Sequence, residues 1–149
     1  MASAPLHADE LPVDGKLAAQ LVSTQFPQWS GLPVEPVRST GTDHVVHRLG
    51  DHLALRFPRV VWAVAQIDKE WVWLPRLAPV LPVPLPRVVA RGRPSERYPW
   101  PWLVYGWVEG SSALDGPSGD QQQLALDLAA FLRGLQRVDT AGAPDAGYR

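Results

Sequence analysis

Apolar residues recur at helical spacing in two segments of the first half of the chain. The first segment lies between Asp14, a residue type that caps helix N-termini, and Pro27, which cannot continue a helix. The second spans residues 60–74, where apolar residues follow at steps of three and four. Pro75 is expected to end or kink this second helix. Both patterns predict amphipathic helices that pack one face on a core.

Shorter apolar runs predict five strands. They are residues 33–37, 44–49, 52–57, 86–90 and 102–108. The prolines of the first run favour an edge position, because an edge strand tolerates a missing N–H donor. Gly50 and Asp51 form a turn signal between the second and third runs, which predicts a β-hairpin. In the third run Leu55 and Phe57 share one face, and Arg56 lies on the other.

The strongest boundary in the chain is the segment 110–119, which is rich in Ser, Gly, Asp and Pro. It separates a predicted lobe of residues 1–109 from a leucine-striped helix of residues 120–138 and a tail of residues 139–149. A five-stranded sheet with its own helix has little apolar surface to spare for the leucine stripe. We therefore expect an α+β fold with a mostly antiparallel sheet, a helix packed on it, and a final helix that opens a missing second lobe.

Composition narrows the function classes. The 149 residues carry 14 basic and 15 acidic side chains, a net charge of −1, which gives no reason to expect a nucleic-acid partner. The chain has no cysteine, so disulfides and thiolate metal sites are excluded. His44 and His47 lie close together in one strand, but no third ligand accompanies them, and we predict no metal site.

The same composition bears on location. No apolar stretch approaches the roughly 18 residues of a membrane span. The first ten residues lack the basic start and apolar stretch of a secretory signal. We therefore expect a cytoplasmic protein with no membrane partner.

Four segments carry candidate chemistry, in this order along the chain. They are residues 39–44 (STGTDH), 53–59 (LALRFPR), 69–79 (KEWVWLPRLAP) and 98–110 (YPWPWLVYGWVEG). Together they resemble the N-terminal lobe of the aminoglycoside phosphotransferase family, the small-molecule relatives of protein kinases. The resemblance covers residues 10–138 and implies a protein-kinase-like N-terminal lobe.

The resemblance implies a nucleotide-binding role for ten residues. They are Ser39, Thr40, Gly41, Thr42, Asp43, Arg56, Glu70, Val104, Tyr105 and Trp107. The small residues of the loop let backbone N–H groups approach phosphates. Arg56 stands where kinases usually place a lysine and would hold the phosphates, with Glu70 as its carboxylate partner. The extended segment 104–107 would give adenine an apolar slot and backbone hydrogen bonds.

The catalytic part of the family pattern does not occur in this sequence. Members use an Asp in a His-Gly-Asp type motif and a second, metal-binding Asp, and neither motif is found here. The resemblance therefore implies a truncated small-molecule kinase that holds only the nucleotide-binding part, with no catalytic or metal-binding residue, and we expect this chain alone to be inactive. The complete enzyme would transfer the γ-phosphoryl group of ATP or GTP, with Mg²⁺, to a hydroxyl of a small molecule. Aminoglycosides are one acceptor class in the family, which connects it to antibiotic resistance.

Each candidate also has a purely structural interpretation. The loop 39–44 can be a hairpin connector, and Arg56 and Glu70 can be solvated surface residues. Tyr105 and Trp107 can be ordinary aromatics of the core or its rim. In that case none of these residues requires a ligand.

Other apolar residues favour packing over ligand binding. Three tryptophans, Trp62, Trp71 and Trp73, are expected to lie in the core or at a lobe interface. The leucine stripe of residues 120–138 is expected to be a packing surface. An alternative function follows from it, an inactive module that binds a partner or itself through this helix, and a third reading is a poorly folded remnant.

Overall fold

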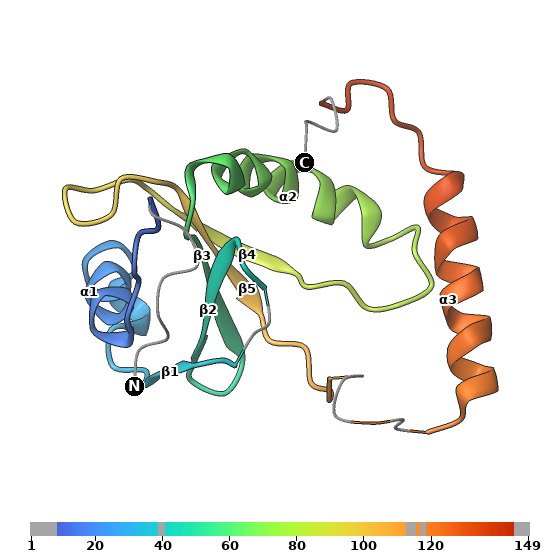
Figure 1. The fold of residues 1–149 in the computed structure, drawn as a ribbon, viewed down its shortest axis with the longest axis horizontal. Coiled ribbons are helices and arrows are strands. Elements are labelled where there is room, and N and C mark those ends of the chain that lie inside the picture. Colours follow the sequence, from blue (N-terminus) through green and yellow to red (C-terminus); the bar gives the residue numbers. More distant parts are fainter. Residues whose placement is uncertain (1–8, 39–40, 113–115, 117–118, 145–149) are drawn as a thin grey trace.

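The computed structural model of the chain describes residues 9–38, 41–112, 116 and 119–144 (Figure 1). The helices are α1 (Gly15–Gln25), α2 (Val64–Leu77) and α3 (Gln121–Gln136), and short 3-10 turns lie at η1 (Pro27–Trp29) and η2 (Val61–Ala63). The strands are β1 (Val34–Pro36), β2 (His44–Leu49), β3 (Leu53–Pro58), β4 (Val88–Gly92) and β5 (Trp102–Gly106).

The five strands form one sheet in the order β1-β2-β3-β5-β4, and every neighbouring pair is antiparallel. This confirms the predicted sheet, including the edge position of the proline-containing β1. The hairpin of β2 and β3 turns at Gly50, whose φ of 56° suits glycine. β3 lies in the centre of the sheet, which gives its side chains neighbours on both sides.

The helix predictions hold with two corrections. Asp14 caps α1 as predicted, because its carboxylate accepts from the N–H of Leu17 at 2.7 Å. The second helix begins at Val64, since the three residues before it form the η2 turn. Pro75 does not end α2, which continues to Leu77. A proline so close to the C-terminus removes a single N–H donor from the last turns, which the helix tolerates.

The last two strands are shifted from their predicted bounds. β4 occupies residues 88–92 instead of 86–90, and β5 stops at Gly106 instead of residue 108. A β-bulge between Val88 and Ala90 offsets the pairing of these two strands. The spacing of apolar residues alone does not reveal a bulge. The predicted bounds of β4 and the predicted end of β5 were wrong by two residues.

The sheet separates two layers of apolar packing, one under each of the first two helices. The larger core lies on the α1 face, where Phe57 stacks on Trp102 with 4.9 Å between ring centroids. Gly92 lies so close to the Trp102 indole that an added Cβ would come within 1.9 Å of the ring. The smaller core lies under α2 and is built on Ile67, Leu103 and Tyr105. The predicted packing of the second helix on the sheet is therefore confirmed.

Two of the three tryptophans that we expected to be packed are exposed. Trp62 is 54% exposed and Trp71 is 39% exposed, so the expectation that they lie in the core is wrong. For Trp71 the reason is that α2 meets the sheet mainly at β4 and β5, and Ile67 is the only buried residue of this helix. Trp73 is half-buried, and the guanidinium of Arg76 lies 5.2 Å from its ring. A lobe-interface role for these tryptophans stays a prediction.

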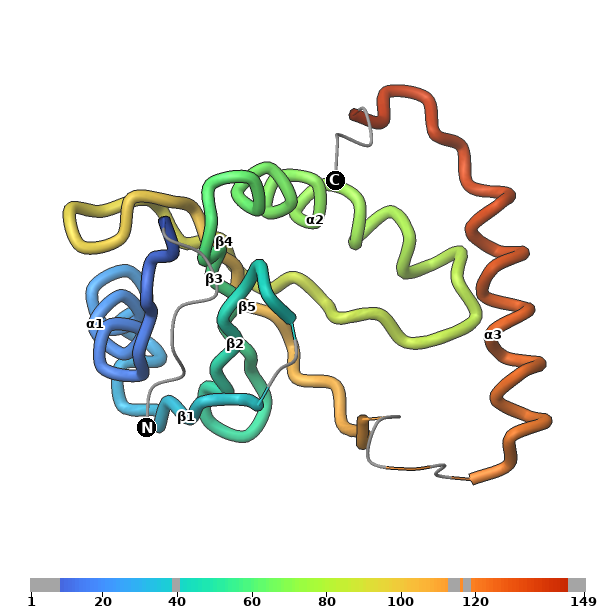
Figure 2. Tube along the Cα trace, viewed as in Figure 1, coloured from blue at the N-terminus to red at the C-terminus, as the bar shows by residue number. Residues whose placement is uncertain are grey.

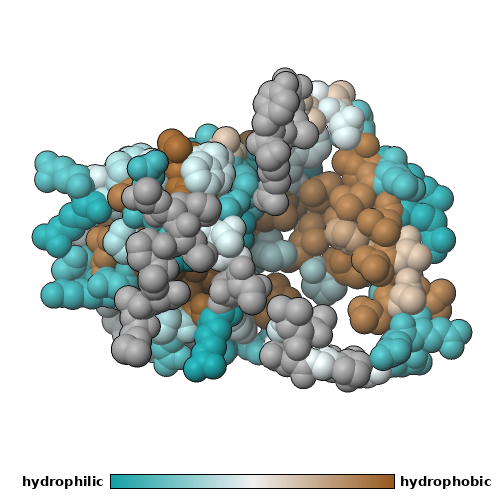
Figure 3. All heavy atoms as spheres, in the orientation of Figure 1, coloured by the Kyte–Doolittle hydropathy of each residue, from teal (hydrophilic) through white to brown (hydrophobic). Residues whose placement is uncertain are grey.

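α3 stands apart from the sheet (Figure 2). Asp120 caps it by accepting from the N–H groups of Gln122 and Gln123. The helix approaches the segment after α2 at Gly134, whose added Cβ would lie 3.0 Å from Leu81. No residue of α3 is buried, and five of its leucines are 36–60% exposed: Leu124, Leu126, Leu128, Leu132 and Leu135. Figure 3 shows apolar side chains gathered where α3 faces the rest of the molecule. As expected, the sheet does not cover the leucine stripe.

No helix in the described part of the chain combines the length and the apolar character needed to cross a membrane.

A buried histidine ties the segment before α1 to the sheet. His47 of β2 is 2% exposed, and its Nε2 lies 2.9 Å from the carbonyl oxygen of Val13, to which it donates. Burial lowers the pKa of His47 below its ordinary value of 6.5. The folded state therefore binds this proton less readily than the unfolded chain does.

We expect the free energy of unfolding to fall as the pH drops below about 6.5, because the unfolded chain then takes up a proton that folded His47 resists. Urea unfolding at pH 8 and pH 5 measures this. His47→Gln keeps a donor for Val13 without titrating, so its stability should depend less on pH. His52→Gln, at an exposed position, is the control. Equal pH dependence in the wild type and His47→Gln would contradict the assignment.

Candidate functional site

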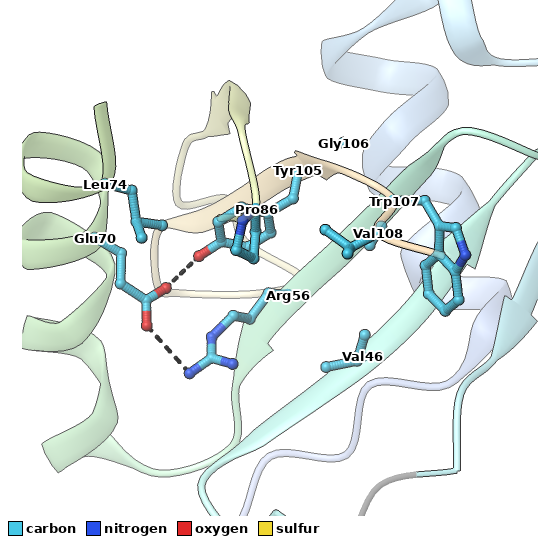
Figure 4. Close-up of a pocket in the computed structure, with 10 residues that line it drawn as sticks. Val46, Arg56, Glu70, Leu74, Pro86, Tyr105, Gly106, Trp107 and Val108 are labelled. Carbon is cyan, nitrogen blue, oxygen red and sulfur yellow. Dashed lines mark hydrogen bonds and ion pairs between the residues drawn. The ribbon is translucent and has the colours of Figure 1, made fainter. Parts of the chain in front are cut away.

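A cleft of about 340 Å³ opens between α2 and the sheet face that α1 does not cover (Figure 4). Ten residues line it: Val46, Ala54, Arg56, Glu70, Leu74, Pro86, Tyr105, Gly106, Trp107 and Val108. Most of these side chains are apolar. The charged exceptions are Arg56 and Glu70, so the cleft combines an apolar slot with one ion pair.

Arg56 and Glu70 form the ion pair that the sequence predicted. The guanidinium nitrogen Nη2 lies 3.2 Å from Oε1 of Glu70, and the two side chains are 30% and 25% exposed. Strand alternation places Arg56 on the α2 face of β3, while Leu55 and Phe57 enter the core on the other face. Glu70 projects toward it from the middle of α2 (Figure 4). The pair therefore bridges the central strand and the helix at the wall of the cleft.

Tyr105 completes this wall in a way that sequence reasoning missed. Its hydroxyl donates to Oε2 of Glu70, so both carboxylate oxygens are engaged. Burial first, and then the negative charge of Glu70, raise the pKa of Tyr105, which keeps the hydroxyl protonated as a donor. Tyr105 pairs with Ala54 across β3 and β5, and the small side chain of Ala54 leaves room for the ring. The alternation of side chains along β5 could have indicated that Tyr105 faces α2. That inference is possible only when the register of β5 is known.

The segment predicted to hold the nucleotide base is only partly in the cleft. Val104 is fully buried and belongs to the core on the α1 face, so its side chain does not line the slot, and its role in nucleotide binding stays a prediction. The N–H of Gly106 donates to the carbonyl of Arg87 at 2.8 Å, and the N–H of Trp107 donates to the carbonyl of His52 at 2.8 Å. Both amide donors are therefore occupied within the protein. Val108, which also lines the cleft, carries the next N–H along the chain.

The Trp107 side chain lies at the mouth of the cleft. The guanidinium of Arg48 lies over its ring, 4.7 Å from the centroid, and Arg48 also pairs with Glu109 at 3.1 Å. Trp107 lines the cleft with Val46 and Val108, as Figure 4 shows. Its predicted contribution to nucleotide binding, which rested on the backbone of this segment, stays a prediction.

The predicted phosphate loop does not line the cleft where it is described. Ser39 and Thr40 lie outside the described residues. The Thr42 hydroxyl donates to the Asp43 carboxylate at 2.9 Å, and the N–H of Arg59 donates to the Asp43 carbonyl at 2.8 Å. Gly41, Thr42 and Asp43 are absent from the cleft lining. Phosphate binding by this loop stays a prediction.

The described residues contain no cluster of three or more His, Asp or Glu side chains that could hold a metal ion. The two histidines of β2 illustrate why. His44 and His47 are three residues apart on one strand, so they lie on opposite faces of the sheet. They cannot share one metal ion.

The fold and the cleft define a class of protein. A five-stranded antiparallel sheet that carries a cation on its central strand, with a helix that supplies the paired carboxylate, is the N-terminal lobe of the kinase-like phosphotransferase fold. The chain belongs to the phosphotransferase enzyme family, whose sequence pattern matches residues 33–149.

Solved structures agree with this assignment. The chain is 25% identical to aminoglycoside 2′-phosphotransferase-IIIa in its GDP complex, with a TM-score of 0.79 over 91% of this chain and 48% of the other. The GDP and kanamycin complex of APH(2″)-IIIa gives 26% identity and a TM-score of 0.73 over 83% of this chain and 42% of the other. The streptomycin–ATP complex of APH(2″)-IIa shares the fold at 15% identity, with a TM-score of 0.58 over 88% of this chain and 43% of the other. The chain thus spans less than half the length of these structures. No curated protein matches the sequence.

Proposed function

We propose that this chain is the nucleotide-binding lobe of a small-molecule phosphotransferase that uses ATP or GTP. The observation that carries the proposal is the Arg56–Glu70 pair at the wall of an otherwise apolar cleft. An aromatic base needs apolar walls and a few polar contacts, and triphosphate needs a fixed cation nearby. The complexes of similar proteins with GDP or ATP support this proposal.

Six of the ten lining residues have a proposed task. Val46, Ala54 and Leu74 would contact the base, and the N–H of Val108 would donate to its edge. Arg56 would hold phosphate oxygens, because a guanidinium presents several donors in one plane. Glu70 would keep that plane in a fixed direction. The loop of residues 39–44 would cover the phosphates.

In the complete reaction, the oxygen of a substrate hydroxyl would attack the γ-phosphorus of the nucleotide. The bond from that phosphorus to its bridging oxygen would break, the nucleoside diphosphate would leave, and the hydroxyl proton would pass to a base. We expect that base and the Mg²⁺ ligands to lie in the part of the family pattern that this sequence lacks, so the part of this chain would be to bind and orient the nucleotide. We expect the 149-residue chain alone to show no turnover.

The proposed acceptor is a hydroxyl of a small molecule. Kanamycin and streptomycin in the complexes of similar proteins make an aminoglycoside the first class to test. Phosphorylation of such a compound would connect the complete enzyme with antibiotic resistance. The use of ATP or GTP also favours a cytoplasmic location.

We expect GTP or ATP to raise the melting temperature of the full chain, since a ligand at 100 times its Kd stabilises the folded state by about 2.7 kcal/mol. Thermal-shift titration with and without Mg²⁺ measures this. Arg56→Ala should abolish the shift. Arg91→Ala should keep it, because Arg91 also pairs a strand with α2, through Asp68, but lies outside the cleft. A cooperative wild-type melt without a shift, or equal shifts in both variants, would contradict the proposal.

A second candidate function is self-association through residues 120–138. The observation that favours it is the row of exposed leucines on α3, none of which the described sheet covers. The sedimentation coefficient, measured over a hundredfold range of protein concentration, should then rise with concentration. Leu128→Glu should suppress that rise. A monomer at every concentration would count against self-association and would leave this face for the remainder of a phosphotransferase fold.

A further inference from the structure

The Arg56 guanidinium has a second partner besides Glu70, and this partner lies next to the cleft. Its nitrogen Nη2 lies 3.3 Å from Nδ1 of His44. His44 opens β2, the strand next to β3, and is 7% exposed. His44 shares a face of β2 with Val46, which lines the cleft. One nitrogen of Arg56 thus meets an imidazole from β2 and a carboxylate from α2.

This contact indicates which role Nδ1 of His44 has in it. A guanidinium has only N–H donors, so in this contact Nδ1 of His44 is the acceptor and carries no proton. A protonated ring would instead place a second positive charge beside Arg56.

The two acceptors also determine what Arg56 can offer a ligand. Nη2 forms the ion pair with Glu70 and also contacts Nδ1 of His44, so both partners engage this one nitrogen. The Nε atom is buried and has no hydrogen-bond partner among the described residues. Contact with a phosphate is then left to Nη1. Because the guanidinium is planar, fixing Nη2 from two sides also fixes the direction of Nη1.

We propose that His44 is a positioning residue that orients Arg56 for nucleotide phosphates. A lysine at position 56 would be a point charge and would need no such support, whereas an arginine must be turned to the correct plane. This inference rests on the proposed function of the cleft. His44 also ends the polar loop 39–44, so the same residue connects the start of β2 with the phosphate-holding cation.

The other histidine of β2 shows why this role belongs to His44. His47 is also buried, but it lies on the α1 face and donates to the backbone carbonyl of Val13. Its hydrogen-bond partner Val13 and its ring neighbour Phe57 both lie outside the cleft lining. His47 therefore serves as a matched control, a buried histidine on the same strand and the opposite face.

The first test is the affinity of the full chain for GTP by titration calorimetry. His44→Leu removes the acceptor and should weaken binding about tenfold, the effect of one lost hydrogen bond to a charged group. His44→Asn places an amide oxygen near the position of Nδ1 and should restore affinity to within about threefold. His47→Gln should bind as the wild type does. If His44→Leu gives no cooperative melt, His44→Phe replaces it, since it keeps a ring without the acceptor.

The second test needs no nucleotide. In ¹⁵N NMR spectra of the guanidinium groups, a fixed Arg56 gives separate Nη signals, and Arg56→Lys identifies them by their loss. The signals should merge in the variant that lacks the acceptor and stay separate in His44→Asn. Merged signals in the wild type, or signals unchanged by loss of the acceptor, would overturn the inference.

The two tests separate the inference from the proposed function. Absence of GTP binding by the wild type would overturn the function, while the NMR signals would still show whether His44 orients Arg56. If the wild type binds GTP and the variant without the acceptor binds it equally well, the positioning role is overturned and the proposed function stands. Loss of binding in both the acceptor-free variant and His44→Asn would also overturn it, because a structural role alone predicts that result.

Discussion

The alternation of side chains along β3 is the constraint on which the rest of the structure depends. Leu55 and Phe57 enter the core under α1, while Ala54 and Arg56 face the cleft under α2. Because β3 is the central strand, a shift of one residue would bury Arg56 in the large core and turn Phe57 toward the cleft. The stacking of Phe57 on Trp102 therefore fixes the place of the cation as firmly as it fixes the core.

The value of the Arg56–Glu70 pair lies in orientation more than in stability. Partly exposed ion pairs contribute only about 0–1 kcal/mol to folding, because water screens them. Here Tyr105 engages the second oxygen of Glu70, and His44 engages the same nitrogen of Arg56. Four side chains from β2, β3, β5 and α2 thus contact one another at the cleft. The main effect of this arrangement is to orient the guanidinium of Arg56.

Much of this architecture could be predicted from local sequence patterns. Asp14, the turn at Gly50 and the proline-containing edge strand are local signals, and each predicted its element. The pairing of Arg56 with Glu70 followed from the family resemblance combined with strand alternation. The continuation of α2 through Pro75 and the bulge in β4 could not be predicted, because both depend on what neighbouring elements tolerate.

The contacts across the sheet were also beyond local patterns. The hydroxyl of Tyr105 reaches Glu70, and Val104 turns into the core, because β5 pairs with β3 in one particular register. The amides of Gly106 and Trp107 donate to carbonyls from two other segments, so the proposed donor to the base is the N–H of Val108. Each of these facts depends on residues more than fifteen positions away in sequence, so a reading of one segment at a time does not find them.

The most direct test of the central claim is to map the amide ¹H–¹⁵N chemical shifts of the full chain during titration with GTP. The account predicts saturable changes at Val46, Arg56 and Val108, which surround the cleft, and little change along α1 or α3. Changes confined to α3, or none at millimolar nucleotide in a folded sample, would contradict the claim that this cleft is a nucleotide site.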